Sequence, residues 1–127
     1  MSMMRSAISF GFLAMVLAGP AFANGKVDVA VCKAMQATLA PRKAEISELT
    51  GQRSASALRA EEAGIAWEDA EIHRLVSAAH AATADRELAA YDAARKQFAR
   101  DELALQSAVQ QFNTDVSVYN TRCTPRG

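Results

Sequence analysis

The sequence contains few glycine, proline and aromatic residues: six glycines, three prolines and 6% aromatics among 127 residues. An all-β fold needs many turns, which are rich in glycine and proline, so this scarcity argues against one. An excess of charge of one sign is also missing, because fourteen Lys and Arg balance fourteen Asp and Glu. We therefore expect no binding to nucleic acid. The length suits one small domain, and the many alanines favour helix.

The motifs of common catalytic and cofactor sites are absent as well. The sequence has no glycine-rich phosphate loop, no His-Glu-x-x-His, no Gly-x-Ser-x-Gly and no Cys-x-x-Cys. Its serines are scattered and fit no motif that pairs a serine with a base, which nucleophilic catalysis would need. We therefore expect a protein that is not an enzyme and that carries no cofactor.

The first 23 residues have the features of a secretory signal peptide. Arg5 is the one charged residue before an apolar stretch at 7–18, and Ala21-Phe22-Ala23 fits the small-x-small pattern of a cleavage site. The apolar stretch falls short of the roughly 20 residues that an uncleaved membrane anchor needs. The sequence thus predicts a signal peptide at 1–23, a single mature domain at 24–127 without a stable membrane anchor, and a periplasmic or secreted location.

Two cysteines, Cys32 and Cys123, lie near opposite ends of the predicted mature chain. In an oxidising compartment such a pair most simply forms one disulfide. Closing a loop of about 90 residues would stabilise the fold by about 4.6 kcal/mol in the chain-entropy model. A redox pair or a thiolate metal site would need closely spaced cysteines, which are missing.

The C-terminal half has the heptad pattern of a coiled-coil helix. Aromatic or leucine residues recur at every seventh position: Tyr91, Phe98, Leu105, Phe112 and Tyr119. The partner positions carry Leu88, Arg95, Glu102, Val109, Val116 and Cys123. The pattern predicts one helix over about 84–122, starting near Thr83 and Asp85.

The N-terminal half carries two apolar stripes that do not share a helix face. The first consists of Cys32, Met35, Leu39, Ile46 and Leu49, and the second of Leu58, Ile65, Ile72 and Val76. A polar run with a glycine separates them, so we expect the first arm to be interrupted near 50–57. The expected segments are 27–49 and 57–81, with the turn near residue 82.

A disulfide between the chain ends favours an even number of helical passes, since the two Cα atoms must lie within about 7 Å. The predicted fold is therefore an all-α antiparallel helical hairpin, or coiled coil, clamped at its termini. Residue numbers of facing pairs would sum to 155 near the disulfide and to about 164 beyond the interruption. The second register pairs Arg95 with Asp69 and leaves Arg53 or Arg59 to reach Glu102.

Trp67 points away from the second stripe, on a face with several alanines. We expect this face to be exposed and to form an interaction surface, with Trp67 as its anchor. Its smaller members are Ala60, Ala63 and Ala70. The alternative is that the helices pack so that Trp67 is covered within one chain.

Asp69, His73 and His80 are the best metal-ligand candidates, because carboxylate and imidazole groups suit zinc or copper. However, His80 lies about 10 Å from His73 along a continuous helix, too far for one ion unless the tip folds back. The leading functional hypothesis is an exported, non-catalytic hairpin that binds protein or self-associates. The alternatives are a periplasmic inhibitor, immunity or chaperone-like protein, and a metal-binding periplasmic protein.

Overall fold

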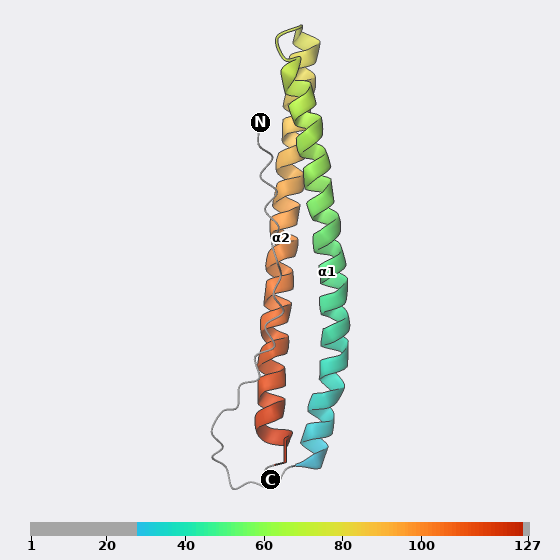
Figure 1. Ribbon diagram of the computed structural model, residues 1–127, viewed down its shortest axis with the longest axis vertical. Coiled ribbons are helices and arrows are strands. Elements are labelled where there is room, and N and C mark those ends of the chain that lie inside the picture. Colours follow the sequence, from blue (N-terminus) through green and yellow to red (C-terminus); the bar gives the residue numbers. More distant parts are fainter. Residues whose placement is uncertain (1–27, 126–127) are drawn as a thin grey trace, which may run out of the picture.

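The computed structural model describes residues 28–125. Two helices, α1 (Val29–Ile72) and α2 (Ala78–Cys123), run antiparallel and lie side by side along their whole length (Figure 1). The predicted all-α hairpin is confirmed. The predicted signal peptide at 1–23 lies outside the described residues.

Both helices begin at a side chain that caps their free backbone N–H groups. The Asp28 carboxylate accepts from the backbone N–H groups of Ala30 and Val31, and Ser77 Oγ accepts from that of His80. Such caps satisfy donors that have no partner within the helix. The cap at Ser77 sets the start of α2. The turn therefore consists of residues 73–77, and its predicted position near residue 82 is wrong. The predicted start near Thr83 is wrong, and Thr83 lies within α2.

The first arm is not interrupted, because α1 continues through residues 50–57. Thr50 and Ser56 do not cap a helix end here: their hydroxyls donate to the carbonyls of Ile46 and Arg53 within the same helix. Gly51 has no positive φ, although a helix-ending glycine normally adopts one. Pro41 also lies inside α1 without ending it.

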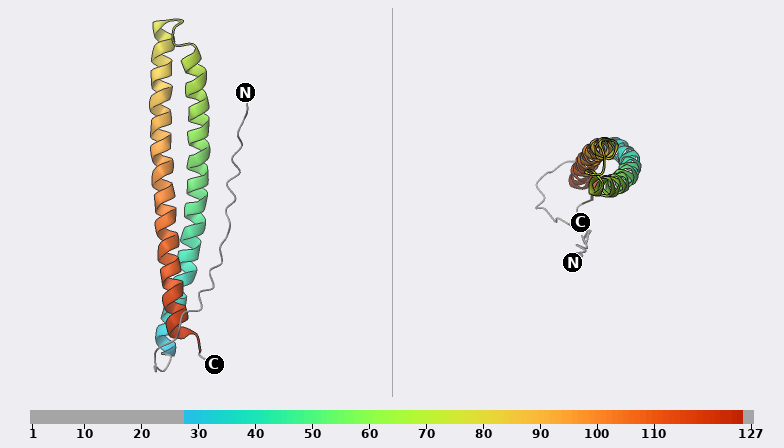
Figure 2. Two further views of the ribbon diagram at one scale, coloured as in Figure 1. Left: turned by 60° about the vertical axis from the view of Figure 1, so that its left-hand side comes forward. Right: turned by 90° about the horizontal axis from the view of Figure 1, so that it is seen from above.

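Because α1 is continuous, a single seam contacts α2 along the whole helix. Its members are spaced alternately three and four residues apart, as in a left-handed coiled coil. They are Cys32, Met35, Leu39, Arg42, Ile46, Leu49, Arg53, Ser56, Ala60, Ala63, Trp67 and Ala70 within α1 and Arg74 just beyond its end, all buried or half-buried. The end-on view in Figure 2 shows the two helices winding around each other.

The opposing side of α2 follows the main row of the predicted heptad, whereas Arg95 and Val109 at the partner positions are exposed. Its central residues, Tyr91, Phe98, Leu105, Phe112 and Tyr119, are all half-buried. Near the tip, the ring of Tyr91 faces a glycine on α1. At Gly64 an added Cβ would lie 3.1 Å from Tyr91 Cε2, so the close approach of the two helices depends on the missing side chain.

One register holds from the disulfide to the tip. Cys32 and Cys123 form the predicted disulfide, with Cα atoms 5.7 Å apart. Ion pairs then join the helices at Arg42–Asp115 (2.7 Å), Arg53–Glu102 (2.6 Å) and Arg74–Asp85 (2.7 Å). The numbers of all four pairs add up to between 155 and 159, so the expected second register is wrong.

This register determines the partners of Arg95 and Glu102, the two charged residues in the predicted heptad of α2. Arg53 does reach Glu102, as one of the two expected candidates. Arg95 is exposed and lies 5.5 Å from the centroid of the Tyr91 ring, and residues 28–125 hold no ion pair between Arg95 and Asp69.

Candidate interaction surface

The side of α1 that faces away from α2 carries an uncharged residue at every seventh position. Each of these residues lies two positions before a seam residue, and all are exposed. We call this row the outer column; it consists of Ala30, Ala37, Ala44, Gly51, Leu58, Ile65 and Ile72.

Large aliphatic side chains occupy the half of the outer column nearer the tip. The exposed fractions are 61% for Leu58, 54% for Ile65 and 77% for Ile72. Leu75 and Val76 extend the apolar surface into the turn and are also largely exposed. Aliphatic side chains in such a row gain little from the hairpin itself, and because they share one face of the helix a single partner can cover them together.

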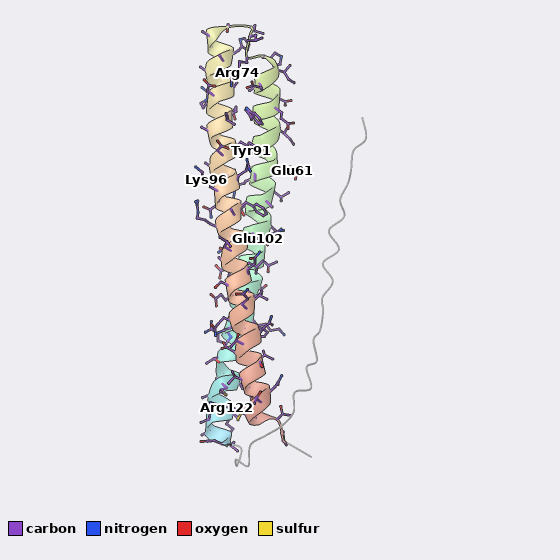
Figure 3. The ribbon with its side chains drawn as sticks, turned by 90° about the vertical axis from the view of Figure 1, so that its left-hand side faces the viewer. Glu61, Arg74, Tyr91, Lys96, Glu102 and Arg122 are labelled. Atoms are coloured by element: carbon purple, nitrogen blue, oxygen red, sulfur yellow. A yellow bond between two sulfur atoms is a disulfide. The ribbon has the colours of Figure 1, made fainter. Side chains whose placement is uncertain are left out.

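Acidic residues flank these aliphatic side chains. Glu61, Glu62, Glu68 and Asp69 are exposed on α1 around Ile65. Figure 3 shows Glu61 on the outer side of α1, whereas Tyr91 lies between the helices. The apolar row therefore has a polar, negatively charged rim, the arrangement found around the apolar centre of protein interfaces.

The surface predicted around Trp67 lies instead against α2. Trp67 is half-buried, and its ring stacks on Tyr91 with centroids 5.7 Å apart and an interplanar angle of 12°. The smaller members Ala60, Ala63 and Ala70 lie in the same seam. The expectation that this face is exposed is wrong, and the alternative that Trp67 is covered within one chain is correct.

The face assigned to the second apolar stripe is also wrong, because the Trp67 side of α1 packs on α2 in its place. Leu58, Ile65 and Ile72 were expected to face the other helix, and they form the outer column instead. The signal that locates them is the spacing of the first stripe: carried through residues 50–57 without a break, it reaches Trp67 and leaves Ile65 on the opposite face.

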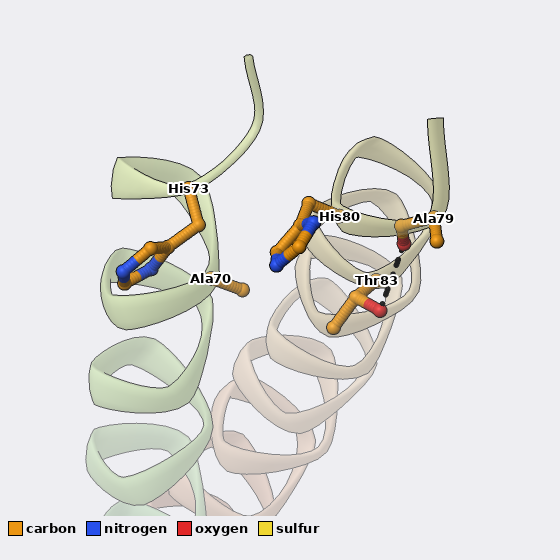
Figure 4. A pocket seen from close by; sticks show the side chains of 5 residues that line it. All are labelled: Ala70, His73, Ala79, His80 and Thr83. Atoms are coloured by element: carbon orange, nitrogen blue, oxygen red, sulfur yellow. Dashed lines mark hydrogen bonds between the residues drawn. The ribbon is translucent and has the colours of Figure 1, made fainter. Parts of the chain in front are cut away.

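The two histidines lie at the tip, where the turn brings the chain back on itself. His73 and His80 have ring centroids 6.2 Å apart, so the tip does fold back enough to bring them together. They line a shallow hollow of about 380 Å³ with Ala70, Ala79 and Thr83 (Figure 4).

Hydrogen bonds define how these imidazoles are held. His73 Nδ1 lies 2.9 Å from the Asp69 carbonyl, which can only accept, so Nδ1 carries the proton and Nε2 of the neutral ring has a free lone pair. His80 Nδ1 lies 2.7 Å from Ser77 Oγ. Within residues 28–125 no three His, Cys, Asp or Glu side chains are grouped to hold a metal ion, and Asp69 contributes only its carbonyl here.

Comparison with known proteins finds no matching family model, no matching curated protein and no matching solved structure. Neither α1 nor α2 contains a stretch that is long and apolar enough to cross a membrane.

Proposed function

We propose that this chain is an exported, non-catalytic helical hairpin that acts by binding protein through the outer column of α1. The observation that carries the proposal is the exposure of Leu58, Ile65 and Ile72 in one row on a helix whose opposite face already packs on α2. A helix with two apolar faces has one more than a two-helix hairpin can cover. Protein association removes such surface from water.

Export is supported by the signal-like pattern of residues 1–23 and by the disulfide, which persists in oxidising compartments. Intact mass spectrometry of the protein recovered outside the cytoplasm tests this directly. The expected species begins at Asn24 and lacks two hydrogens. A chain that retains residues 1–23, or one with two free thiols, would count against export.

Site-specific photo-crosslinking in the producing cell tests the binding role. A photoreactive amino acid at Ile65 is compared with the same group at Gln110, which is exposed on α2. We expect covalent adducts from Ile65 and none from Gln110. No adduct from Ile65, or equal adducts from both positions, would contradict the proposal. An inhibitor, an immunity protein and a chaperone-like protein would differ in the mass and variety of the adducts.

Metal binding at the tip is a second candidate function, favoured by the 6.2 Å separation of the His73 and His80 rings. Imidazole nitrogen suits copper and zinc, and metal-bound histidines usually donate their other ring N–H to a neighbour, as His73 does. Titration with Zn²⁺ should shift the NMR signals of both rings together, and titration with paramagnetic Cu²⁺ should broaden both. Loss of the shift at His80 in His73→Gln would show a shared ion, and unmoved signals would reject it.

A further inference from the structure

We propose that the protein bound at the outer column is a second copy of this chain, with the two α1 helices packed antiparallel about a two-fold axis at Gly51. The inference rests on the proposed function and names its partner. Three independent features of α1 support it: the order of residue sizes along the outer column, the position of Gly51, and the charges beside the column.

The sizes along the outer column run from small at the disulfide end to large at the tip. A two-fold axis at Gly51 reverses this order in the second copy, so each large side chain meets a small one. An isologous interface requires this self-complementarity, because every contact occurs twice. The pairs across the axis are Ala30 with Ile72, Ala37 with Ile65, Ala44 with Leu58, and Gly51 with Gly51.

Gly51 has no role in the packing of the hairpin. A Cβ added there would meet nothing within 4 Å, in contrast to Gly64, where it would meet Tyr91. A glycine inside a helix costs about 0.5–1 kcal/mol relative to alanine, so its presence needs another explanation. Close approach of a second helix at the axis supplies one.

Charges beside the outer column pair with opposite charges in this arrangement. In two-fold-related antiparallel helices each flanking row faces its own copy. Lys33 then lies opposite Glu68 of the second copy, and Glu45 lies opposite Arg59. By symmetry each pair forms twice. None of these four residues forms an ion pair elsewhere within residues 28–125, so all are free to do so.

The competing parallel arrangement brings like charges together. It places the acidic cluster of one copy, which surrounds Ile65, beside the same cluster of the other. Like charges opposed at an interface are unfavourable. In the antiparallel arrangement Glu61 and Glu62 lie instead opposite Ala40 and Pro41, and no acidic residue faces another.

Charge reversal on the mature, oxidised protein tests both the dimer and its register. Light scattering or sedimentation over a concentration series should give twice the chain mass for the wild type. Lys33→Glu and Glu68→Lys should each weaken the dimer about tenfold, because each replaces two attractive pairs with two repulsive ones. The double variant Lys33→Glu/Glu68→Lys should recover to within about threefold of the wild type, because the pairs are restored with exchanged signs.

Lys96→Glu is the matched control, since Lys96 is exposed on the outer side of α2 (Figure 3). It should leave the dimer unchanged, and circular dichroism should show all variants equally helical. A monomer at every concentration overturns the inference, as does a double variant no stronger than the single ones. If the wild type is monomeric but Ile65 crosslinks to a different protein, the proposed function survives without the second copy. If it is monomeric and Ile65 gives no adduct, both fail.

Discussion

At the scale of single residues, the Arg53–Glu102 pair shows how a charge is accommodated in the seam. Arg53 Nε donates to Glu102 Oε2 at 2.6 Å, and the guanidinium carbon lies 5.1 Å from the centroid of the Phe98 ring. The planar guanidinium thus binds the carboxylate and contacts an aromatic ring at the same time. Charged residues at seam positions of a coiled coil commonly fix register, and this pair agrees with the register of the disulfide.

The Arg53 hydrogen bond lowers the pKa of the Glu102 carboxyl below its ordinary value of 4.5. A carboxyl with a lowered pKa in the folded state contributes stability that is complete above the unfolded pKa and is lost as pH falls through the folded one. We expect Glu102→Gln to destabilise the protein at pH 7 by up to about 1 kcal/mol. The difference from wild type should shrink steadily below pH 4.5.

Urea unfolding of both proteins at several pH values measures this difference. Taking the difference removes the contributions of the other carboxylates, which are common to both proteins. Arg53→Gln provides the control, because without the guanidinium a further Glu102→Gln change should have little effect at any pH. A difference between wild type and Glu102→Gln that stays constant down to pH 2 would contradict the assigned cause.

At the scale of the helices, periodicity located both elements but placed the faces of α1 incorrectly. The heptad of aromatic and leucine residues predicts both the α2 helix and its buried side, because these large side chains lie on that side. In α1 the buried side near the tip consists mostly of small residues, together with Trp67, which stacks on Tyr91. Size therefore pointed to the outer Leu58, Ile65 and Ile72 as the packed face.

The expected interruption of α1 has a related origin. The polar run at 50–57 predicts a linker if its hydroxyl groups face water. In the structure Ser56 is buried in the seam and its hydroxyl bonds to the Arg53 carbonyl. The sequence alone does not show that Ser56 lies opposite large rings. The candidate surface was missed for this reason, although its large members Leu58, Ile65 and Ile72 belong to the second predicted stripe.

The two helical glycines should respond differently to alanine. Gly51→Ala should raise the free energy of unfolding by about 0.5–1 kcal/mol, because alanine favours helix and its Cβ meets nothing within the hairpin. Gly64→Ala should gain less or lose stability, because its Cβ would lie 3.1 Å from Tyr91. Urea unfolding at a concentration low enough to keep the chain monomeric makes the comparison. An equal increase in the free energy of unfolding at both sites would show that the Tyr91 ring moves away from the new Cβ at no cost.

At the scale of the whole molecule, the hairpin is a thin rod with little interior. Within residues 28–125 only Ala84 and Ser56 are buried, since each helix can cover just one side of the other. A small fold with such a limited core commonly depends on a covalent staple. The disulfide holds the end of the rod remote from the turn, so both ends of the helix pair are joined (Figure 1).

Removal of the disulfide should therefore cost more than any single side-chain change in the seam. We expect Cys32→Ala/Cys123→Ala to lose about 2–5 kcal/mol, because the unfolded chain regains the freedom of a long loop. Hydrogen exchange should then show a gradient. Amides near Met35 and Tyr119 should lose protection first, since this end is held by the disulfide, while those near Trp67 and Tyr91 stay protected by the turn and the ring stack. Uniform loss of protection along both helices would mean that the rod opens as one unit, with the disulfide acting only on the unfolded state.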